Sequence, residues 1–215
     1  MHWLDRLGRA RRTECDMVGL GWHLHAETQL AGLAGARFDY DRTWAQWLPR
    51  ADPMGRVAEG VYLAGDGLRI LGADGAEVSG RLAAAACLSD LDLQAPDTSA
   101  DLRRLSRLAR FSGGISRAFP WPSEWIRGLP GDTVVCRCEG ITADDLRDAV
   151  SHGGPEANRA KSVGRVGMGR CQGRFCQLAG AELVAAQPGL PPEAVGRLRD
   201  QPPVRPAPIA AMIAE

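Results

Sequence analysis

Two pairs of cysteines constrain this chain more than any other feature of its sequence. Cys136 and Cys138 form a C-x-C pair, and Cys171 and Cys176 form a C-x4-C pair after 32 intervening residues. In a reducing compartment, clustered cysteines favour metal or redox chemistry over disulfide bonds. We therefore expect the fold to bring together two loops that are distant in the sequence.

Four thiolates are compatible with more than one kind of site. They suit a tetrahedral zinc ion or a [2Fe-2S] cluster. Structural zinc sites commonly use C-x2-C pairs, and neither pair here has that spacing. The chemistry favours an iron–sulfur site over structural zinc, and either of these over four unligated thiols.

Basic residues accompany the cysteines. Arg137, Arg170 and Arg174 lie next to them in the sequence, and Lys161 is nearby. Their positive charge would partly offset that of four thiolates and raise the reduction potential of a cluster. Surface arginines without this role would show the same pattern, so both interpretations stay open.

The stretch after the first cysteine pair has the features of a specified helix start. Thr142 is placed as the N-cap and Asp145 as its capping-box partner, with Ile141 and Leu146 as a hydrophobic staple. The pair of glycines at 153–154 is expected to end this helix.

The stretch around the second pair is suited to enclosing a small group. Gly167, Gly169 and Gly173 allow a close backbone approach. A helix starting within "CQLAGAELVAA" would point its first N–H groups at Cys171 and Cys176. This arrangement would stabilise negatively charged sulfur.

Composition excludes some classes of partner. The 215 residues carry 26 basic and 26 acidic side chains, so no net charge attracts nucleic acid. No window reaches the ~18 apolar residues of a membrane span, and we expect a cytoplasmic protein. The isolated cysteines, Cys15 and Cys87, are expected to be buried core thiols. The histidines are expected to be structural or surface residues without a metal or catalytic role: His2, His23, His25 and His152.

The chain divides into a mixed part up to about residue 95 and a helical part after it. The mixed part has a strand candidate in "CDMVGLG", a short helix in "AETQLAGLAG", a hairpin over 36–49 and a strand in "EGVYLAGDG" followed by a helix over 73–88. The segment "DLRRLSRLARF" predicts an amphipathic linker helix whose apolar face is Leu102, Leu105, Leu108 and Phe111. The far end, "QPPVRPAP", is proline-rich and is expected to be extended.

The pattern C-R-C-E, 32 residues, then G-M-G-R-C-Q-G-R-F-C resembles the helical [2Fe-2S] domain of the bacterioferritin-associated ferredoxin type. It is most similar to the version attached to FAD-dependent amine and amino-acid dehydrogenase subunits, of the opine oxidase, hydrogen cyanide synthase and hydroxyproline dehydrogenase type. The resemblance covers residues 133 to about 186. It implies that the cluster ligands are Cys136, Cys138, Cys171 and Cys176.

Residues 61–86 resemble the last strand, turn and helix of the FAD-binding domain in two-dinucleotide-fold flavoproteins. That resemblance implies that Asp66, between Gly65 and Gly67, bonds the ribityl chain of the cofactor, and that the helix start near Gly72 and Ala73 faces the flavin ring. The alternative is that Asp66 binds no cofactor and only ends the strand of an ordinary strand–turn–helix.

Two departures from the flavoprotein pattern matter. Leu68 and Arg69 follow the Gly-Asp-Gly turn where relatives have small residues, and the sequence contains no G-x-G-x-x-G fingerprint. The fingerprint half would then come from a partner chain, or the chain is truncated, or it works as an electron-transfer module without its own FAD. A half-domain alone is expected to be poorly soluble or oligomeric.

These features predict an α+β protein: a partial FAD-binding α/β segment followed by a small all-helical [2Fe-2S] domain. The expected divisions are 1–95 for the flavoprotein portion, 96–130 for a helical linker, 131–188 for the iron–sulfur domain and 189–215 for the tail. The expected function is oxidation of an amine or amino acid within a complex of dehydrogenase subunits, with this chain transferring electrons through [2Fe-2S] and sharing FAD with a partner chain. A stand-alone electron carrier and a structural zinc protein are the alternatives, and no residue is nominated as a catalytic acid or base.

Overall fold

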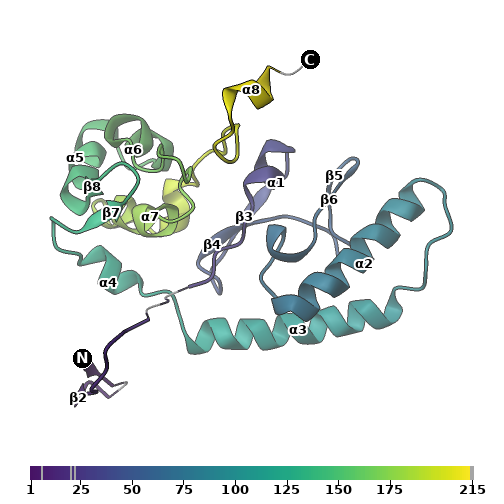
Figure 1. Cartoon of the computed structure of the whole chain (residues 1–215), viewed down its shortest axis with the longest axis horizontal. Coiled ribbons are helices and arrows are strands. Elements are labelled where there is room, and N and C mark those ends of the chain that lie inside the picture. The colour runs from purple at the N-terminus through teal and green to yellow at the C-terminus, as the bar shows by residue number, and fades with distance from the viewer. Residues whose placement is uncertain (6, 20, 22, 214–215) are drawn as a thin grey trace.

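A computed structural model describes residues 1–5, 7–19, 21 and 23–213 of the chain. Figure 1 shows two groups of elements side by side, one around the long helices α2 and α3 and the other a small unit around α5, α6 and α7. The hairpin of β1 and β2 at the N-terminus lies apart from both groups. The fold is α+β, as the sequence predicts.

The strands are short and pair only locally. In the described residues each sheet has two antiparallel strands. The pairs are β1 (His2–Leu4) with β2 (Ala10–Arg12), β3 (Phe38–Asp41) with β4 (Gln46–Pro49), β5 (Arg56–Ala58) with β6 (Val61–Tyr62), and β7 (Val134–Cys136) with β8 (Ile141–Thr142). The predicted hairpin over 36–49 is therefore confirmed.

Two strand predictions in the first part need correction. "CDMVGLG" forms no strand in its described residues, 15–19 and 21. "EGVYLAGDG" contributes only Val61–Tyr62 to a strand, and its Gly65–Gly67 stretch is a 3-10 turn, η1. Since β6 pairs with β5 alone, no neighbour within the described chain extends it into the parallel sheet of a dinucleotide fold.

Two long helices form the main layer of the first part. The predicted helix over 73–88 is confirmed as α2 (Gly72–Asp90), and the amphipathic linker helix as α3 (Ser99–Ala118). The buried positions of α2 facing its neighbours include Val78 and Leu82, and an ion pair between Arg81 and Asp101 joins the two helices at 2.7 Å. The short helix α1 (Gln29–Leu33) precedes β3, also as predicted.

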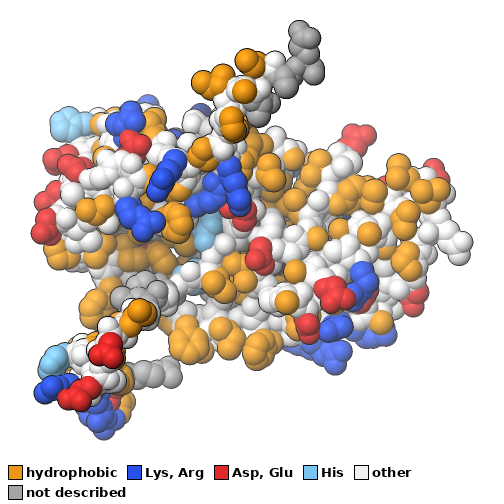
Figure 2. Space-filling model, viewed as in Figure 1, with side chains coloured by type: hydrophobic (Ala, Val, Ile, Leu, Met, Phe, Trp, Pro, Cys, Tyr) orange, Lys and Arg blue, Asp and Glu red, His pale blue; other side chains and the backbone are white. Residues whose placement is uncertain are grey.

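The apolar face of α3 is only partly covered. Leu102, Leu105 and Leu108 are half-buried, whereas Phe111 on the same predicted face is 70% exposed. The C-terminal end of α3 runs on beyond the start of α2 (Figure 1). Exposed arginines of α3 contribute to the basic side chains along the lower edge of the molecule (Figure 2).

The second unit packs around one apolar core. Its elements are α4 (Ser123–Arg127), the β7–β8 pair, α5 (Ala143–Gly153), α6 (Ala157–Gly164), α7 (Gln177–Ala186) and the 3-10 turn η2 (Pro192–Val195). The core includes Leu146, Leu183 and Val195 together with Cys136 and Cys176. The β7–β8 pair means that this unit is not all-helical.

Local sequence signals specify the start of α5. Thr142 and Asp145 form the predicted capping box, with the Thr142 amide 2.9 Å from the Asp145 carboxylate. Leu146 is fully buried and Ile141 packs against the same core, as a hydrophobic staple requires. The helix ends before Gly154, whose φ of 84° is in the left-handed region.

Helix α8 (Ile209–Met212) follows the proline-rich segment near the C-terminus. None of the helices in the described ranges combines the length and the apolar character needed to cross a membrane.

Candidate functional site

The fold brings the two cysteine pairs together inside the second unit. Cys136 ends β7, Cys138 lies in the turn after it, Cys171 lies in the loop after α6, and Cys176 is the N-cap of α7. The Cys136 thiol lies close to that of Cys176, and the Cys138 thiol lies close to that of Cys171. Each contact joins one residue from each predicted pair.

The four thiols meet as two pairs rather than as one preformed group. Among the residues that the structure describes, no three His, Cys, Asp or Glu side chains are arranged to hold a single metal ion. The ligand role of Cys136, Cys138, Cys171 and Cys176 therefore stays a prediction. What the geometry provides is the proximity that such a role requires.

The environment of the thiols differs from one pair to the other. Burial raises the pKa of Cys176, and the neighbouring Cys136 adds to this rise. Burial also acts to raise the pKa of Cys171, but hydrogen bonds from the Phe175 backbone, the Cys138 thiol and the Gly173 backbone outweigh it and lower the pKa overall. The loop therefore favours the thiolate form of Cys171.

Glycine permits the close approach of the two loops. A Cβ built at Gly169 would lie 2.3 Å from the Cβ of Cys138, so no larger residue fits there unless the loops move apart. Gly167 and Gly173 have φ values of 79° and 85°, which a glycine adopts without strain. The sequence-based expectation that these glycines allow the backbone to wrap closely is confirmed.

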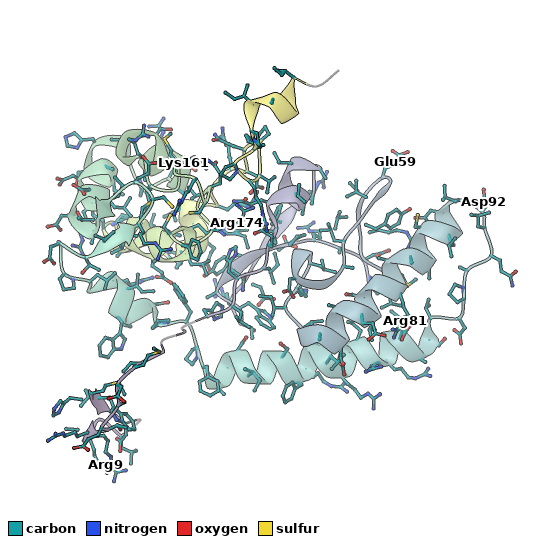
Figure 3. All side chains as sticks on the ribbon, in the orientation of Figure 1. Arg9, Glu59, Arg81, Asp92, Lys161 and Arg174 are labelled. Atoms are coloured by element: carbon teal, nitrogen blue, oxygen red, sulfur yellow. The ribbon has the colours of Figure 1, made fainter. Side chains whose placement is uncertain are left out.

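The four predicted basic residues occupy different environments. Arg137 lies over the ring of Phe175 at 5.6 Å from its centroid, and Arg170 is exposed. Lys161 is buried, and burial lowers its pKa although Asp200 and Cys176 act in the opposite direction. Figure 3 shows Lys161 within the second unit and Arg174 on the side of that unit facing the first group of elements.

The Gly-Asp-Gly turn packs onto α2. The Gly65 amide donates to the Ser79 hydroxyl at 2.8 Å, and the Asp66 side chain is exposed. The start of α2 follows at Gly72 and Ala73, both exposed. These positions are compatible with the expected flavin contacts of Gly65, Asp66, Gly67, Gly72 and Ala73, which stay predictions.

The two residues that depart from the flavoprotein pattern line an open cleft beside the turn. Leu68 and Arg69 lie there together with Leu102 and Leu105 of α3. Arg69 is also tied back to Asp41 of β3 by an ion pair at 3.1 Å. The Arg69 guanidinium in this cleft is therefore paired rather than free.

Sequence reasoning missed the residues that connect the two sites. Residues 25–29 lie between the turn and the cysteine loop, and three of their side chains contact that loop at sequence separations of 143 to 152 residues. His25 is predicted to have no functional role, yet burial lowers its pKa to about 4 and its ring contacts Gln177. Such contacts leave no local pattern in the sequence.

The predictions for the isolated cysteines are wrong. Cys15 is exposed, as are all the described residues from 13 to 19, and Cys87 on α2 is only half-buried.

Known proteins resemble this chain in sequence and in fold. Residues 131–215 match the family model described as the sarcosine oxidase A3 domain. The fold of the whole chain is similar to that of an L-proline dehydrogenase from P. horikoshii, with a TM-score of 0.66 at 18% identity, covering 42% of that protein. The family match applies to residues 131–215, and the structural match indicates the fold.

Two sequence relatives are similar to most of the chain. The chain is 40% identical over 195 residues to an opine oxidase subunit of Agrobacterium tumefaciens, covering 86% of this chain and 38% of the relative. It is 29% identical over 220 residues to hydrogen cyanide synthase subunit HcnB of Pseudomonas aeruginosa, covering 97% of this chain and 46% of the relative. The chain thus spans less than half the length of these relatives. The expected similarity to opine oxidase and hydrogen cyanide synthase subunits is confirmed, while the bacterioferritin-associated ferredoxin type of domain stays a prediction.

Proposed function

We propose that this chain forms part of a flavin- and iron–sulfur-dependent dehydrogenase that oxidises an amine or amino acid, and that it carries a [2Fe-2S] cluster on Cys136, Cys138, Cys171 and Cys176. The observation that carries the proposal is the proximity of the two cysteine pairs. Their loops approach so closely that only a glycine fits at position 169. The similarity to oxidase and dehydrogenase subunits supports the reaction class.

The donor set fits the proposed group. Four cysteine thiolates are the usual ligands of a [2Fe-2S] cluster, which when bound accepts and releases single electrons. Backbone N–H groups of Gly173 and Phe175 are directed at the Cys171 sulfur, and Cys136 and Cys176 lie in the core, away from water. Lys161 supplies buried positive charge close to Cys176. The backbone N–H groups would stabilise the sulfur ligands, the core would exclude water, and Lys161 would balance the negative charge.

The flavin side of the proposal rests on the turn and the helix after it. We assign the exposed Asp66 to a hydroxyl of an FAD ribityl chain, the flanking Gly65 and Gly67 to its close approach, and the helix start at Gly72 and Ala73 to the flavin ring. A flavoprotein portion outside these 215 residues, in a partner chain or a longer form of this one, would supply the pyrophosphate site.

Metal analysis tests the iron–sulfur assignment directly. Protein purified without oxygen is expected to be brown and to contain about two irons and two sulfides per chain. Cys138→Ser should remove most of the iron, whereas Cys15→Ser, a matched change at an exposed cysteine outside the site, should not. Colourless protein with one bound zinc would show that the site is structural.

The flavin assignment has its own test. The complex of this chain with a co-purifying flavoprotein subunit should contain FAD and oxidise opines, hydroxyproline or glycine with an artificial electron acceptor. Asp66→Ala should weaken FAD binding in that complex without changing its iron content. A stable flavin-free monomer that loads iron and takes no flavoprotein partner would instead support the stand-alone electron carrier.

A further inference from the structure

The segment from His25 to Gln29, which we call the inter-site strap, contacts both candidate sites. On one side the Glu27 amide donates to the carbonyl oxygen of Asp66 at 3.0 Å. On the other side the Glu27 carboxylate accepts from Nε of Arg174 at 2.5 Å. A single residue of the strap therefore joins the Gly65–Gly67 turn to the loop that carries Cys171.

Arg174 continues this connection to the cysteine itself. Its Nη1 donates to the carbonyl oxygen of Cys171 at 3.2 Å and to that of Val204 at 2.8 Å. Only 18% of the Arg174 side chain is exposed, so the ion pair with Glu27 is partly shielded from water. Figure 3 shows Arg174 where the two parts of the molecule meet.

Alternate residues of the strap face the same way. His25, Glu27 and Gln29 contact Gln177, Arg174 and the carbonyl oxygen of Gln172, the last at 2.7 Å. The residues between them, Ala26 and Thr28, are 1% and 5% exposed. The strap is thus held on both faces. Its polar face contacts residues within the range 172–177, which spans the end of the cysteine loop and the first residue of α7.

This contact carries unpaired polar atoms that packing for stability alone would avoid. Oε1 of Glu27, Oε1 of Gln29 and Nη2 of Arg174 are buried without a hydrogen-bond partner among the described residues. Buried unpaired polar atoms oppose folding and are uncommon in native proteins. Their concentration at one junction indicates that a polar connection is retained there at some expense in stability.

We propose that the strap sets the separation and orientation of the two sites, and that Glu27 and Arg174 are positioning residues for electron transfer between them. This inference rests on the proposed function, in which the turn adjoins a flavin and the cysteines hold a cluster. The protein's contribution to such transfer is to fix where each cofactor lies. Glu27 does so for both sites, through its backbone toward the turn and through its side chain toward the cysteine loop.

Hydrogen exchange of the iron-free full chain tests the strap without any cofactor. Two amides report on its two ends: that of Glu27, bound to Asp66, and that of Arg174, bound to the Cys171 carbonyl at 3.2 Å. Arg174→Met should accelerate exchange of the Glu27 amide at least about tenfold, and Glu27→Gln should do the same at the Arg174 amide. Each variant thereby reads out the far end of the connection.

Arg42→Met is the matched control. The Arg42–Glu193 pair also joins the two parts of the molecule, at 2.6 Å, but contacts neither the turn nor the cysteine loop. It should leave both reporter amides within about twofold of the unaltered chain. The proposed role of the strap is refuted if Arg174→Met leaves the exchange rate of the Glu27 amide unchanged. It is also refuted if Arg42→Met raises that rate equally.

The iron-loaded chain provides a second readout, in its visible circular dichroism and midpoint potential. Loss of the positive charge of Arg174 beside Cys171 should lower the potential and alter the spectrum, and Arg42→Met should change neither. If the Arg174→Met and Arg42→Met variants have identical spectra and potentials, the positioning role of Arg174 is rejected. If the unaltered chain binds no iron, the proposed function fails, while the exchange result still decides whether the strap couples the two ends.

Discussion

Replacing Gly169 by alanine measures how closely the two cysteine loops must approach. The new Cβ would lie 2.3 Å from Cβ of Cys138 and 3.1 Å from Oε1 of Glu139. Non-bonded carbon atoms rest about 3.5–4.0 Å apart, so the loops must separate by more than about 1 Å. Metal–ligand distances tolerate only about 0.2 Å, so this displacement exceeds what a shared site can absorb. The φ of Gly169 lies outside the left-handed region, so the contact and not the backbone is under test.

We expect Gly169→Ala protein to retain less than about a tenth of the iron bound by the unaltered chain after anaerobic reconstitution, measured by metal analysis and visible absorption. The iron-free variant should lose only about 1–3 kcal/mol of unfolding free energy, as overpacked cores do. Gly114→Ala on α3, whose new methyl group would meet nothing within 4 Å, should load iron normally. Full iron loading of Gly169→Ala with an unchanged spectrum would show that the Cys138 turn and the Cys171 loop need not approach each other.

Three further outcomes concern the second unit. Thr142→Ala should lower the unfolding free energy by about 1 kcal/mol in urea denaturation, because the capping box at the start of α5 is lost. The backbone and hydroxyl hydrogen bonds of Thr142 hold the pKa of Asp145 below its ordinary value, so the associated stability is present above about pH 4 and lost as the pH falls through the lowered pKa. Asp145→Asn should therefore flatten the acid side of the stability profile, and an unchanged profile would contradict this. Arg127→Met should cost about 2–3 kcal/mol, somewhat less than a fully buried pair, because it leaves the buried Glu182 carboxylate with one fewer donor. Arg50→Met, which breaks an exposed pair, should cost much less than Arg127→Met, and equal losses would argue against a special role for burial.

The features predicted correctly from the sequence are those that depend on near neighbours. The capping box of Thr142 and Asp145 needs residues only three positions apart, and the hairpin over 36–49 needs one polar turn between two alternating stretches. The helix that begins after Cys176 likewise follows from its own composition. Such signals are contained within a few residues, so tertiary packing has little opportunity to override them.

The wrong predictions concern burial, which depends on what else covers a residue. Phe111 occupies the predicted helical position on the apolar face of α3, but it is exposed. Cys15 precedes the apolar residues Met17 and Val18 in the sequence, yet it is exposed. Periodicity identifies the face of a helix and cannot indicate how far its neighbour extends.

The sequence by itself determined several local features: the two closely spaced cysteine pairs, the glycines between them, and the helix starts at Thr142 and Cys176. Local hydrogen bonding and the backbone freedom of glycine are enough to specify these features. The tertiary structure alone decided that Cys136 meets Cys176, that Cys138 meets Cys171, and that Glu27 reaches Arg174 across 147 positions of the chain. Contacts between residues so distant in the sequence form only when the intervening helices pack, and packing is a property of the whole fold.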